Sequence, residues 1–487
     1  MKDITLLEAR MMGAPGTPKE LSYGSLSVAS ALDTAGFSVQ YKCGMRDEPL
    51  KPVPESILGS LKNSADIIGI SAMSNVLPYL LLATKRLKES YPEKTIIFGG
   101  AAVESQVTSV EILKKFPSVD VAVNGRGEKT VLDVMDSIKK GKELGNVKGI
   151  CYRDGGKVYF NGLRPPERDL ESLPPISEKF LKGCELIRIP TSAGCPFNCG
   201  FCPGFGRLRY RSIDKVMEDL AVIKHACPKV YVGFSDNCFT VDRKRTFEIC
   251  DRIKQEFGDL KWTCLSRVNT IDEELLRKIS SSGCDRIFFG VESGSDNVLK
   301  GIRKGFTSEE ARRAMLKSRK FVENIVASLL WGLPFESGDD FLETLRMAVQ
   351  FSERDITSII SLLSPVKGTE LFKLHSGSMI FVPELVSMYC AIRATPYKKI
   401  NMGIANISDP RAIRMIESNP SLFCNHCVYS PDGVRKKLAL ARKFFLKAIG
   451  SEVVVTSPDT CHRWGDREKN GQGSVAFPKK LYDKGFG

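Results

Sequence analysis

Hydrophobic residues along the first 150 positions fall into two alternating patterns. Short apolar runs, typical of buried strands, are separated by longer stretches with apolar residues three and four positions apart, typical of helices. The predicted strands cover 3–7, 37–41, 67–71, 95–98 and 119–123, and the predicted helices cover 23–35, 77–90 and 130–140. This alternation indicates an α/β domain over residues 1–150, with a parallel sheet covered on both faces. Such sheets bind ligands beyond the carboxyl ends of their strands.

The alternation is interrupted and then resumes. Pro165-Pro166 and Pro174-Pro175 indicate a linker over residues 151–183. Between 184 and 375 the predicted strands are 186–189, 230–234, 263–266, 286–289, 325–330 and 356–363. Six β/α units favour a full or partial (β/α)6 barrel of the TIM type, whose chemistry lies at the carboxyl ends of the strands. Two predicted helices begin with capping-box patterns, at Thr270–Glu273 and Thr307–Glu310.

Residues 376–487 lack this rhythm and are strongly basic. They carry 17 Lys+Arg against 9 Asp+Glu. We expect a small, mainly helical region with a basic amphipathic helix over 433–449. This helix either packs on the barrel as an ordinary surface helix or docks a macromolecular substrate.

Composition narrows the class of protein. The chain has 487 residues, 42% hydrophobic content and a net charge of +14, which suit a globular protein of two or three domains. It contains 15 cysteines but 4 histidines. Because the first residues do not form a signal-peptide pattern and no apolar run reaches about 18 residues, we expect neither a disulfide-rich secreted protein nor a membrane span. The thiols are typical of a reducing, anaerobic cytoplasm.

Three cysteines carry the strongest chemical signal. Cys195, Cys199 and Cys202 follow the first barrel strand with the spacing C-x3-C-x2-C. Three thiolates on one short loop are suited to hold three irons of a 4Fe–4S cluster and to leave the fourth iron open. A zinc site usually needs four ligands, and the sequence offers no fourth cysteine or histidine in register with this loop.

With this motif the chain resembles the radical S-adenosylmethionine (SAM) superfamily. Further motifs follow the later barrel strands in the order of that superfamily: Ser235-Asp236-Asn237, Ser266-Arg267, Gly290–Gly294, Gly332–Glu336 and Ser364–Glu370. The resemblance implies that the three cysteines hold the cluster, that Ser235 and Asp236 lie near the SAM amine, and that Arg267, Glu292 and Ser293 lie near its carboxylate and ribose. It also implies an electron donor such as ferredoxin or flavodoxin. Polar residues at strand ends also cap helices, which is the alternative role for each SAM contact.

The first domain resembles the Rossmann-like cobalamin-binding domain that precedes many radical SAM cores. The resemblance assigns contacts with the nucleotide tail of cobalamin to small and polar residues at strand ends: Ser71, Gly99, Gly100, Gly125 and Glu128. It places Met73, Asn75 and Val76 in a loop that faces the cobalt. The first histidine of the chain is His225, so this domain offers no histidine as the lower cobalt ligand.

A second set of metal-binding residue types lies in the basic C-terminal region. Cys424 and Cys427 form a C-x2-C pair, and Cys461-His462 follows 34 residues later. Together they form a candidate zinc site. The alternative is a set of ordinary reduced thiols.

The two resemblances together imply a cobalamin-dependent radical SAM C-methyltransferase that acts on an unactivated sp3 carbon. The layout is most similar to methanogen enzymes that modify methyl-coenzyme M reductase after translation, in particular the methylase of a glutamine Cα in its alpha subunit. We therefore expect a peptide or protein substrate and no nucleic acid. Two alternatives are a ring-forming or rearranging enzyme of lipid, antibiotic or tetrapyrrole biosynthesis, and a non-catalytic cobalamin or cluster sensor. A methylthiolating tRNA enzyme is disfavoured because residues 1–183 offer Cys43 and Cys151 alone.

Overall fold

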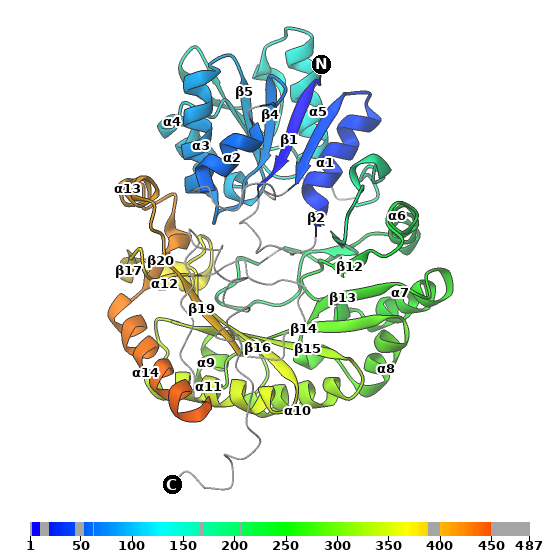
Figure 1. Cartoon of the computed structure of the whole chain (residues 1–487), viewed down its shortest axis with the longest axis vertical. Helices are drawn as coiled ribbons and strands as arrows, with labels where there is room; N and C mark the ends of the chain where they lie inside the picture. Colours follow the sequence, from blue (N-terminus) through cyan, green and yellow to red (C-terminus); the bar gives the residue numbers. More distant parts are fainter. Residues whose placement is uncertain are drawn as a thin grey trace.

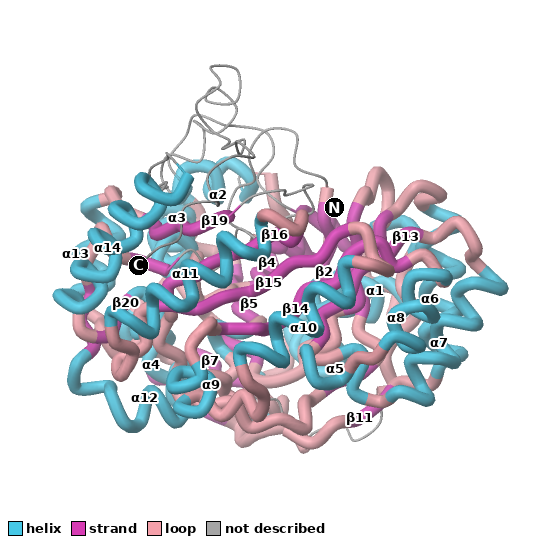
Figure 2. Tube along the Cα trace, turned by 90° about the horizontal axis from the view of Figure 1, so that it is seen from below, coloured by secondary structure: helices cyan, strands magenta, loops and turns pink. Residues whose placement is uncertain are grey.

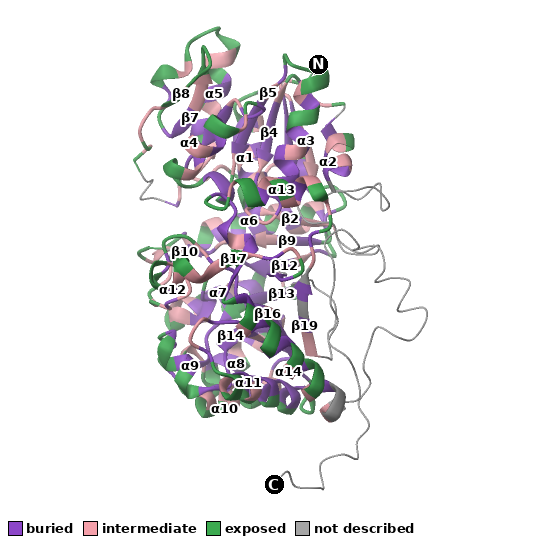
Figure 3. Cartoon of the chain, turned by 90° about the vertical axis from the view of Figure 1, so that its left-hand side faces the viewer, coloured by how far each residue is buried: buried purple, intermediate pink, exposed green. Residues whose placement is uncertain are grey.

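Two large sheets, each surrounded by helices, make up the computed structural model of the chain (Figure 1). The structure describes residues 2–9, 19–43, 53–61, 63–165, 170–204, 206–387 and 400–449. The strands lie in the buried interior and the helices carry most of the exposed surface (Figure 3). None of the helices in these ranges is both long and apolar enough to cross a membrane.

The first sheet has seven strands in the order β3-β1-β4-β5-β6-β7-β8. Its strands are β1 (Ile4–Glu8), β3 (Val39–Cys43), β4 (Ile67–Ser71), β5 (Thr95–Gly99), β6 (Val121–Val123), β7 (Ile150–Asp154) and β8 (Lys157–Phe160). The first five strands of this order are parallel, and β7 and β8 add an antiparallel hairpin. At Gly69 in β4 an added Cβ would lie 2.5 Å from Leu6 Cδ2, so the small residue allows the packing over β1.

Helices cover both faces of this sheet, which confirms the predicted doubly covered arrangement. One face carries α1 (Tyr23–Thr34) and α5 (Glu128–Lys139), and the other carries α2 (Val53–Leu61), α3 (Leu77–Ser90) and α4 (Gln106–Lys115) (Figure 1). The central strands β1, β4, β5 and β6 are mostly buried because helices lie above and below them.

The second sheet has nine strands in the order β18-β19-β16-β15-β14-β13-β12-β9-β2. The six predicted barrel strands are β9 (Leu186–Ile189), β12 (Tyr231–Phe234), β13 (Lys261–Ser266), β14 (Cys284–Glu292), β15 (Asn324–Trp331) and β16 (Ile356–Leu362). Their outer helices are α6 (Ile213–Ala226), α7 (Arg243–Glu256), α8 (Glu273–Ser281), α10 (Ser308–Arg319) and α11 (Gly338–Ser352). All six strands are parallel, and the helices lie along the outside of the curved sheet, which gives the predicted partial barrel (Figure 2).

One edge of the barrel is made by a strand from the first domain. The strand β2 (Glu20–Ser22) pairs in parallel with β9, with Glu20 opposite Leu186 and Ser22 opposite Arg188. The Arg188 guanidinium also pairs with the Glu20 carboxylate at 2.7 Å. Leu21 is fully buried, in the hydrophobic core shared by α1 and the barrel strands. The sequence pattern did not predict this strand, because three residues are too few for a period to appear.

The C-terminal region makes the other edge. The strand β19 (Ile400–Ala405) pairs with β16, and β18 (Val386–Ser387) pairs with β19. The helix α13 (Pro410–Ser418) packs against α3 of the first domain, through Ala412 and Ile416. The remaining elements are α9 (Asp296–Gly301), α12 (Glu370–His375), α14 (Pro431–Ile449), β10 (Ser192–Ala193), β11 (Arg209–Tyr210), β17 (Met379–Phe381) and β20 (Cys427–Tyr429).

The basic helix α14 packs on the outside of the barrel beside α11 (Figure 1). Its Lys437 is buried and pairs with the buried Glu336 carboxylate at 2.9 Å. One face of α14 therefore packs on the barrel, as expected for an ordinary surface helix. Arg435 and Lys436 lie on its exposed face.

The two predicted capping boxes have different outcomes. In α10 the Thr307 hydroxyl accepts from the Glu310 amide, and the Glu310 carboxylate accepts from the Thr307 amide, as predicted. The prediction was wrong at Thr270, since α8 is capped by Asp272, whose carboxylate accepts from the Leu275 amide at 2.9 Å. The Thr270 hydroxyl instead donates to the Arg267 carbonyl oxygen at 2.9 Å.

Leu21→Ala is expected to lower the free energy of unfolding by about 2–5 kcal/mol, because the cavity left between α1 and β9 collapses only in part. Urea unfolding followed by circular dichroism measures the change. Leu163→Ala is the control, since Leu163 is 62% exposed and its truncation is expected to cost less than about 0.5 kcal/mol. Equal losses of the free energy of unfolding in the two variants would show that β2 does not hold the first domain and the barrel together.

Candidate active site

The three predicted cluster cysteines lie on one loop between β9 and α6. All three are free and half-buried. The loop is held by its own backbone, since the Cys202 amide donates to the Cys199 carbonyl oxygen at 3.1 Å and the Cys195 amide donates to Gly206 at 3.3 Å. Burial raises the pKa of the Cys202 thiol, and the nearby sulfurs of Cys199 and Cys195 act in the same direction.

Two short helices, α9 and α12, anchor this cysteine loop. The Gly200 amide donates to the Ile302 carbonyl oxygen at 3.0 Å, and the Leu371 amide donates to the Gly200 carbonyl oxygen at 3.1 Å. The residue before the first cysteine must be small: Gly194 has φ +93°, and an added Cβ would lie 2.4 Å from the Arg207 carbonyl oxygen. The loop therefore presents its thiols at a defined place at the carboxyl ends of the strands.

No group of three or more His, Cys, Asp or Glu side chains in the described ranges is close enough to bind a single metal ion. In a cluster each thiolate binds a different iron, so the three sulfurs need not converge on a single ion. The donor set is three thiolates on one loop, which is what the cluster requires.

Arg267, at the carboxyl end of β13, is a buried charged group that lies against the cysteine loop. It is 6% exposed, and its Nη1 donates to Cys199 Sγ at 3.3 Å. The resemblance placed this residue near the SAM carboxylate, and that contact stays a prediction. The contact with a cysteine sulfur was not predicted.

Glu292, the last residue of β14, forms a buried ion pair. Its carboxylate lies 3.1 Å from Lys304 Nζ, and both side chains are less than a tenth exposed. Glu292 has φ +71°, an unusual conformation for a residue with a side chain, and the pairing of β14 with β15 shifts at this point. The turned backbone directs the carboxylate toward Lys304, whose Nζ also lies 5.9 Å from the centre of the Phe201 ring.

Asp236, predicted to lie near the SAM amine, holds the segment that leads into the cysteine loop. Its buried carboxylate accepts from the Thr191 amide at 3.2 Å, from the Thr191 hydroxyl at 3.0 Å and from the Ser192 hydroxyl. Burial raises the pKa of Asp236, although these hydrogen bonds act in the opposite direction. Ser235 beside it is exposed. Contacts of the two residues with SAM stay predictions.

Ser293 faces the outer helix. Its hydroxyl lies 2.9 Å from the Thr344 hydroxyl of α11 and accepts from the Ser295 amide at 3.1 Å. The next residue, Gly294, is pressed against α11, since an added Cβ would lie 2.5 Å from the Glu343 carbonyl oxygen. These contacts correspond to the alternative role for polar residues at strand ends, in which they join the strand to a helix.

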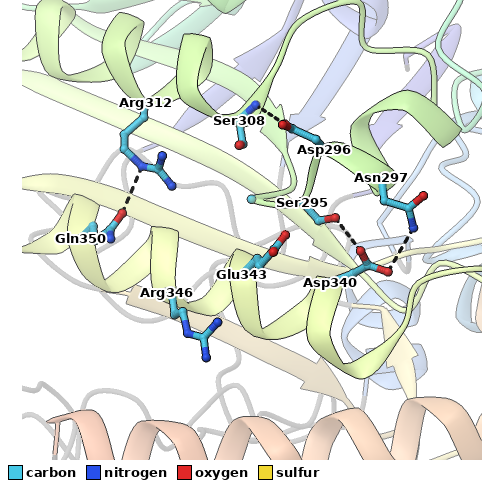
Figure 4. A pocket seen from close by; sticks show the side chains of 10 residues that line it. Ser295, Asp296, Asn297, Ser308, Arg312, Asp340, Glu343, Arg346 and Gln350 are labelled. Carbon is cyan, nitrogen blue, oxygen red and sulfur yellow. Dashed lines mark hydrogen bonds between the residues drawn. The ribbon is translucent and has the colours of Figure 1, made fainter. Parts of the chain in front are cut away.

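A polar cavity of about 420 Å³ lies behind this turn, between α9, α10 and α11 (Figure 4). Its side chains bond largely to one another: Arg312 Nε donates to Gln350 at 3.1 Å, and Asp340 accepts from Ser295 and Asn297. None of the predicted site residues lines it. We therefore treat it as a gap between packed helices and not as part of the active site.

A second cavity, of about 440 Å³, lies between the first sheet and the start of the barrel. Five of the predicted cobalamin contacts line it, namely Ser71, Gly99, Gly100, Gly125 and Glu128. Gly100 has φ +90°, and an added Cβ would lie 2.9 Å from the Ala72 carbonyl oxygen. The opposite wall comes from the barrel half, through Pro190, Ser192, Ala193, Arg209 and Arg211.

Two buried polar atoms on the wall of this cavity have no hydrogen-bond partner among the described residues. They are Tyr23 Oη and Arg211 Nε, in side chains that belong to residues 8% and 3% exposed. Burial raises the pKa of Tyr23. A buried polar atom without a partner is costly, so the two atoms indicate a polar ligand in the cavity. Tyr23 begins the helix predicted over 23–35, whereas no spacing in the sequence pointed to Arg211.

Three arginines and one glutamate line the cavity: Arg126, Arg209, Arg211 and Glu128. Glu128 pairs with Arg126 at 3.2 Å, and Arg211 pairs with the buried Asp219 at 2.8 Å. The surplus of positive charge on the lining favours a ligand with an anionic group. The nucleotide tail of cobalamin, with its phosphodiester and flat aromatic base, fits this lining.

The predicted cobalt-facing residues lie outside the lining of the cavity. Met73 is 45% exposed, and Val76 is fully buried. The Asn75 carbonyl oxygen lies 3.4 Å from Nε2 of His426, which reaches it from the C-terminal region. Burial lowers the pKa of His426 to about 4, so this histidine is neutral at neutral pH.

The candidate second metal site is described in part. Cys424 and Cys427 are buried, and burial raises the pKa of both thiols, to about 12 for Cys427. Metal binding at these two cysteines stays a prediction. Cys461 and His462 lie outside the described residues.

Comparisons with known proteins match both halves of the chain. Residues 189–348 match the family described as the Radical SAM superfamily, and residues 18–135 match the B12 binding domain. An uncharacterized methyltransferase of Pyrococcus horikoshii is 31% identical over 324 residues, which cover 64% of this chain and 70% of that protein. The anaerobic magnesium-protoporphyrin IX monomethyl ester cyclase of Rubrivivax gelatinosus is 30% identical over 306 residues, which cover 58% and 54%.

Solved structures show the same fold. The radical SAM methyltransferase TsrM from Kitasatospora setae, with tryptophan substrate and a SAM analog bound, superposes with a TM-score of 0.62 at 16% identity, covering 90% of this chain and 88% of that one. The cobalamin-dependent radical enzyme OxsB, with aqua-cobalamin bound, superposes with a TM-score of 0.57 at 22% identity. That match covers 72% of this chain, which spans about half of the OxsB chain (52%).

Cys199→Ser is expected to abolish bound iron after anaerobic purification, because two thiolates do not hold the cluster. Iron and sulfide analysis measures the loss. Cys424→Ser is the matched control and is expected to keep full iron content, since Cys424 is buried in the C-terminal region. Equal iron losses in both variants would contradict the assignment. Zinc measured in the same samples tests the second site, which is supported only if Cys424→Ser removes bound zinc.

Proposed function

The chain belongs to the cobalamin-dependent radical SAM methyltransferase family, and we propose that it methylates an unactivated sp3 carbon of a peptide or protein residue. One observation carries this proposal. Pro190, Ser192 and Ala193 line the cavity of the first domain, and the first cluster cysteine, Cys195, follows two residues later. The same short segment therefore joins the cavity suited to cobalamin and the loop suited to the cluster.

The cofactors of the chain are a 4Fe–4S cluster, SAM and cobalamin, which when bound supply a carbon-centred radical and a transferable methyl group. The residues fit these groups: Cys195, Cys199 and Cys202 would hold the cluster, and the cavity lined by Gly99 and Gly100 would hold the tail of cobalamin. The protein supplies orientation and exclusion of water.

Three buried groups orient this site. The Asp236 carboxylate fixes Thr191 and Ser192, which lie between the cavity and the cysteine loop. In the ion pair of Glu292 with Lys304 the two opposite charges cancel, so the pair adds no net charge at the end of β14. All three side chains belong to residues less than a tenth exposed.

A macromolecular substrate is supported by the surface of the C-terminal region. The helix α14 exposes Arg435, Lys436, Arg442 and Lys443, while Lys437 is used in packing. An exposed basic face favours an acidic macromolecular partner. Within this class our best candidate is the Cα of a glutamine in the alpha subunit of methyl-coenzyme M reductase. Modification of such a residue would also require an electron donor such as ferredoxin or flavodoxin.

Ring formation is the second candidate function. It is supported by the 30% identity with the magnesium-protoporphyrin cyclase of Rubrivivax gelatinosus, an enzyme that closes a ring. The two functions differ in the fate of SAM. A methyl transfer consumes one SAM as methyl donor and a second SAM as radical source. Ring formation through a radical needs SAM as radical source and no SAM as methyl donor.

The methylation proposal predicts S-adenosylhomocysteine and 5′-deoxyadenosine in equal amounts. The purified holoprotein is incubated anaerobically with SAM, a reductant and peptides from cells that lack the gene, and peptides heavier by one methylene are identified by mass spectrometry. Cys199→Ala is the control and is expected to give neither product. Formation of 5′-deoxyadenosine without S-adenosylhomocysteine would contradict methylation and support ring formation.

The cavity assignment predicts that Arg211→Gln weakens cobalamin binding by roughly tenfold or more, because a charge-assisted hydrogen bond to the tail phosphate is lost. Cobinamide, which lacks the nucleotide tail, is expected to bind the variant and the parent chain equally. Tyr23→Phe is the milder variant, since it removes only the hydroxyl group. Equal weakening for cobalamin and cobinamide would place the tail elsewhere. Spectroscopic titration of the apoprotein measures both affinities.

A further inference from the structure

Arg267 contacts the cysteine loop in a way that the proposed function does not use. Its guanidinium carbon lies 4.0 Å from the centre of the Phe197 ring, within the cysteine loop, and 5.3 Å from the centre of the Phe306 ring. Arg267 Nε donates to Asn269 Oδ1 at 3.0 Å. Two aromatic faces and one amide thus fix the guanidinium, whose Nη1 lies 3.3 Å from Cys199 Sγ.

The charge of Arg267 is not neutralised by a carboxylate. Among the described residues no Asp or Glu forms an ion pair with it, and Glu292 on the next strand is paired with Lys304. A buried cation is costly unless an anionic group compensates it. The sulfur of Cys199, as a thiolate, is the compensating group that the structure offers.

A second arginine that contacts the same loop, from the segment after α9, provides a contrast. Arg303 donates to the Asn198 carbonyl oxygen at 3.1 Å, but it is 44% exposed and pairs with the Glu370 carboxylate. Arg267 and Arg303 therefore both hold the cysteine loop, whereas Arg267 alone of the two brings an uncompensated charge to a ligand sulfur.

We propose that Arg267 sets the reduction potential of the cluster through a charge-assisted hydrogen bond to the Cys199 sulfur. The proposal rests on the proposed function only in requiring a cluster at the three cysteines. Reduction adds one negative charge to the cluster, and a fixed positive charge in a dry site stabilises the reduced form. Hydrogen bonds to ligand sulfurs are among the groups that tune such potentials. Arg267 thereby makes the cluster easier to reduce.

The test is a redox titration of the reconstituted holoprotein with dithionite, followed by electron paramagnetic resonance in the absence of SAM. Arg267→Gln is expected to lower the midpoint potential, and Arg267→Lys is expected to lower it less, because the charge is kept but the planar donor is lost. Arg303→Gln is the matched control and is expected to leave the potential unchanged, since its charge is already neutralised by Glu370.

A potential that is the same in Arg267→Gln and the parent chain would overturn the proposal, as would an equal shift in Arg303→Gln. If Arg267→Gln fails to assemble a cluster, Phe197→Leu replaces it. That variant removes an aromatic face from the guanidinium without changing the charge, and it is expected to lower the potential by a smaller amount. If the midpoint potential of Phe197→Leu equals that of the parent chain, the proposal is overturned.

The spectral change that SAM causes distinguishes a role of Arg267 in SAM binding from a role in setting the reduction potential. If Arg267→Gln keeps the parent potential but loses the spectral change that SAM causes, Arg267 binds the SAM carboxylate and the redox proposal is wrong. If no variant and no parent preparation assembles a cluster, the proposed function itself fails. The two failures are therefore distinguishable in one set of samples.

Discussion

The parallel pairing of β2 with β9 is the interaction on which the arrangement of both halves depends. Three residues of the first domain, Glu20–Ser22, complete the edge of the barrel sheet and lie between β1 and α1. The buried Glu8 carboxylate at the end of β1 accepts from Ser22, Ser25 and Tyr41, which ties β2 to the first sheet. Backbone pairing has a fixed spacing, so β2 fixes how close this segment of the first domain lies to β9.

The site follows from that constraint. The cavity between the halves exists because β9 ends beside the strands of the first sheet, and the segment after β9 forms its wall before it becomes the cysteine loop. On the far side, α13 packs against α3 and His426 reaches the Asn75 carbonyl oxygen. Two separate bridges therefore hold the first domain over the carboxyl ends of the barrel strands.

Several buried charged groups in and beside the barrel are compensated by a neighbouring group. Glu292 pairs with Lys304, Glu336 with Lys437 and Asp219 with Arg211. Pairing reduces the cost of keeping a charge away from water. Arg267 is the member of this set that faces a sulfur and two aromatic rings in place of a carboxylate. Arg267 therefore brings a buried positive charge directly to a cysteine sulfur.

The sequence by itself determined the features that depend on local spacing. The alternation of strands and helices, the three-thiol loop and the glycines at strand ends are each defined within a few consecutive residues. The structure shows the predicted alternation and brings the glycines to the lining of one cavity. The tertiary structure decided which way the polar side chains at strand ends point. Asp236 turns toward Ser192, Ser293 turns toward α11 and Arg267 reaches Cys199. The tertiary structure also decided that β2 joins the barrel sheet and that Arg211 lines the cavity. Both depend on how segments distant in the sequence pack together, and the local hydrophobic pattern carries no information about that packing.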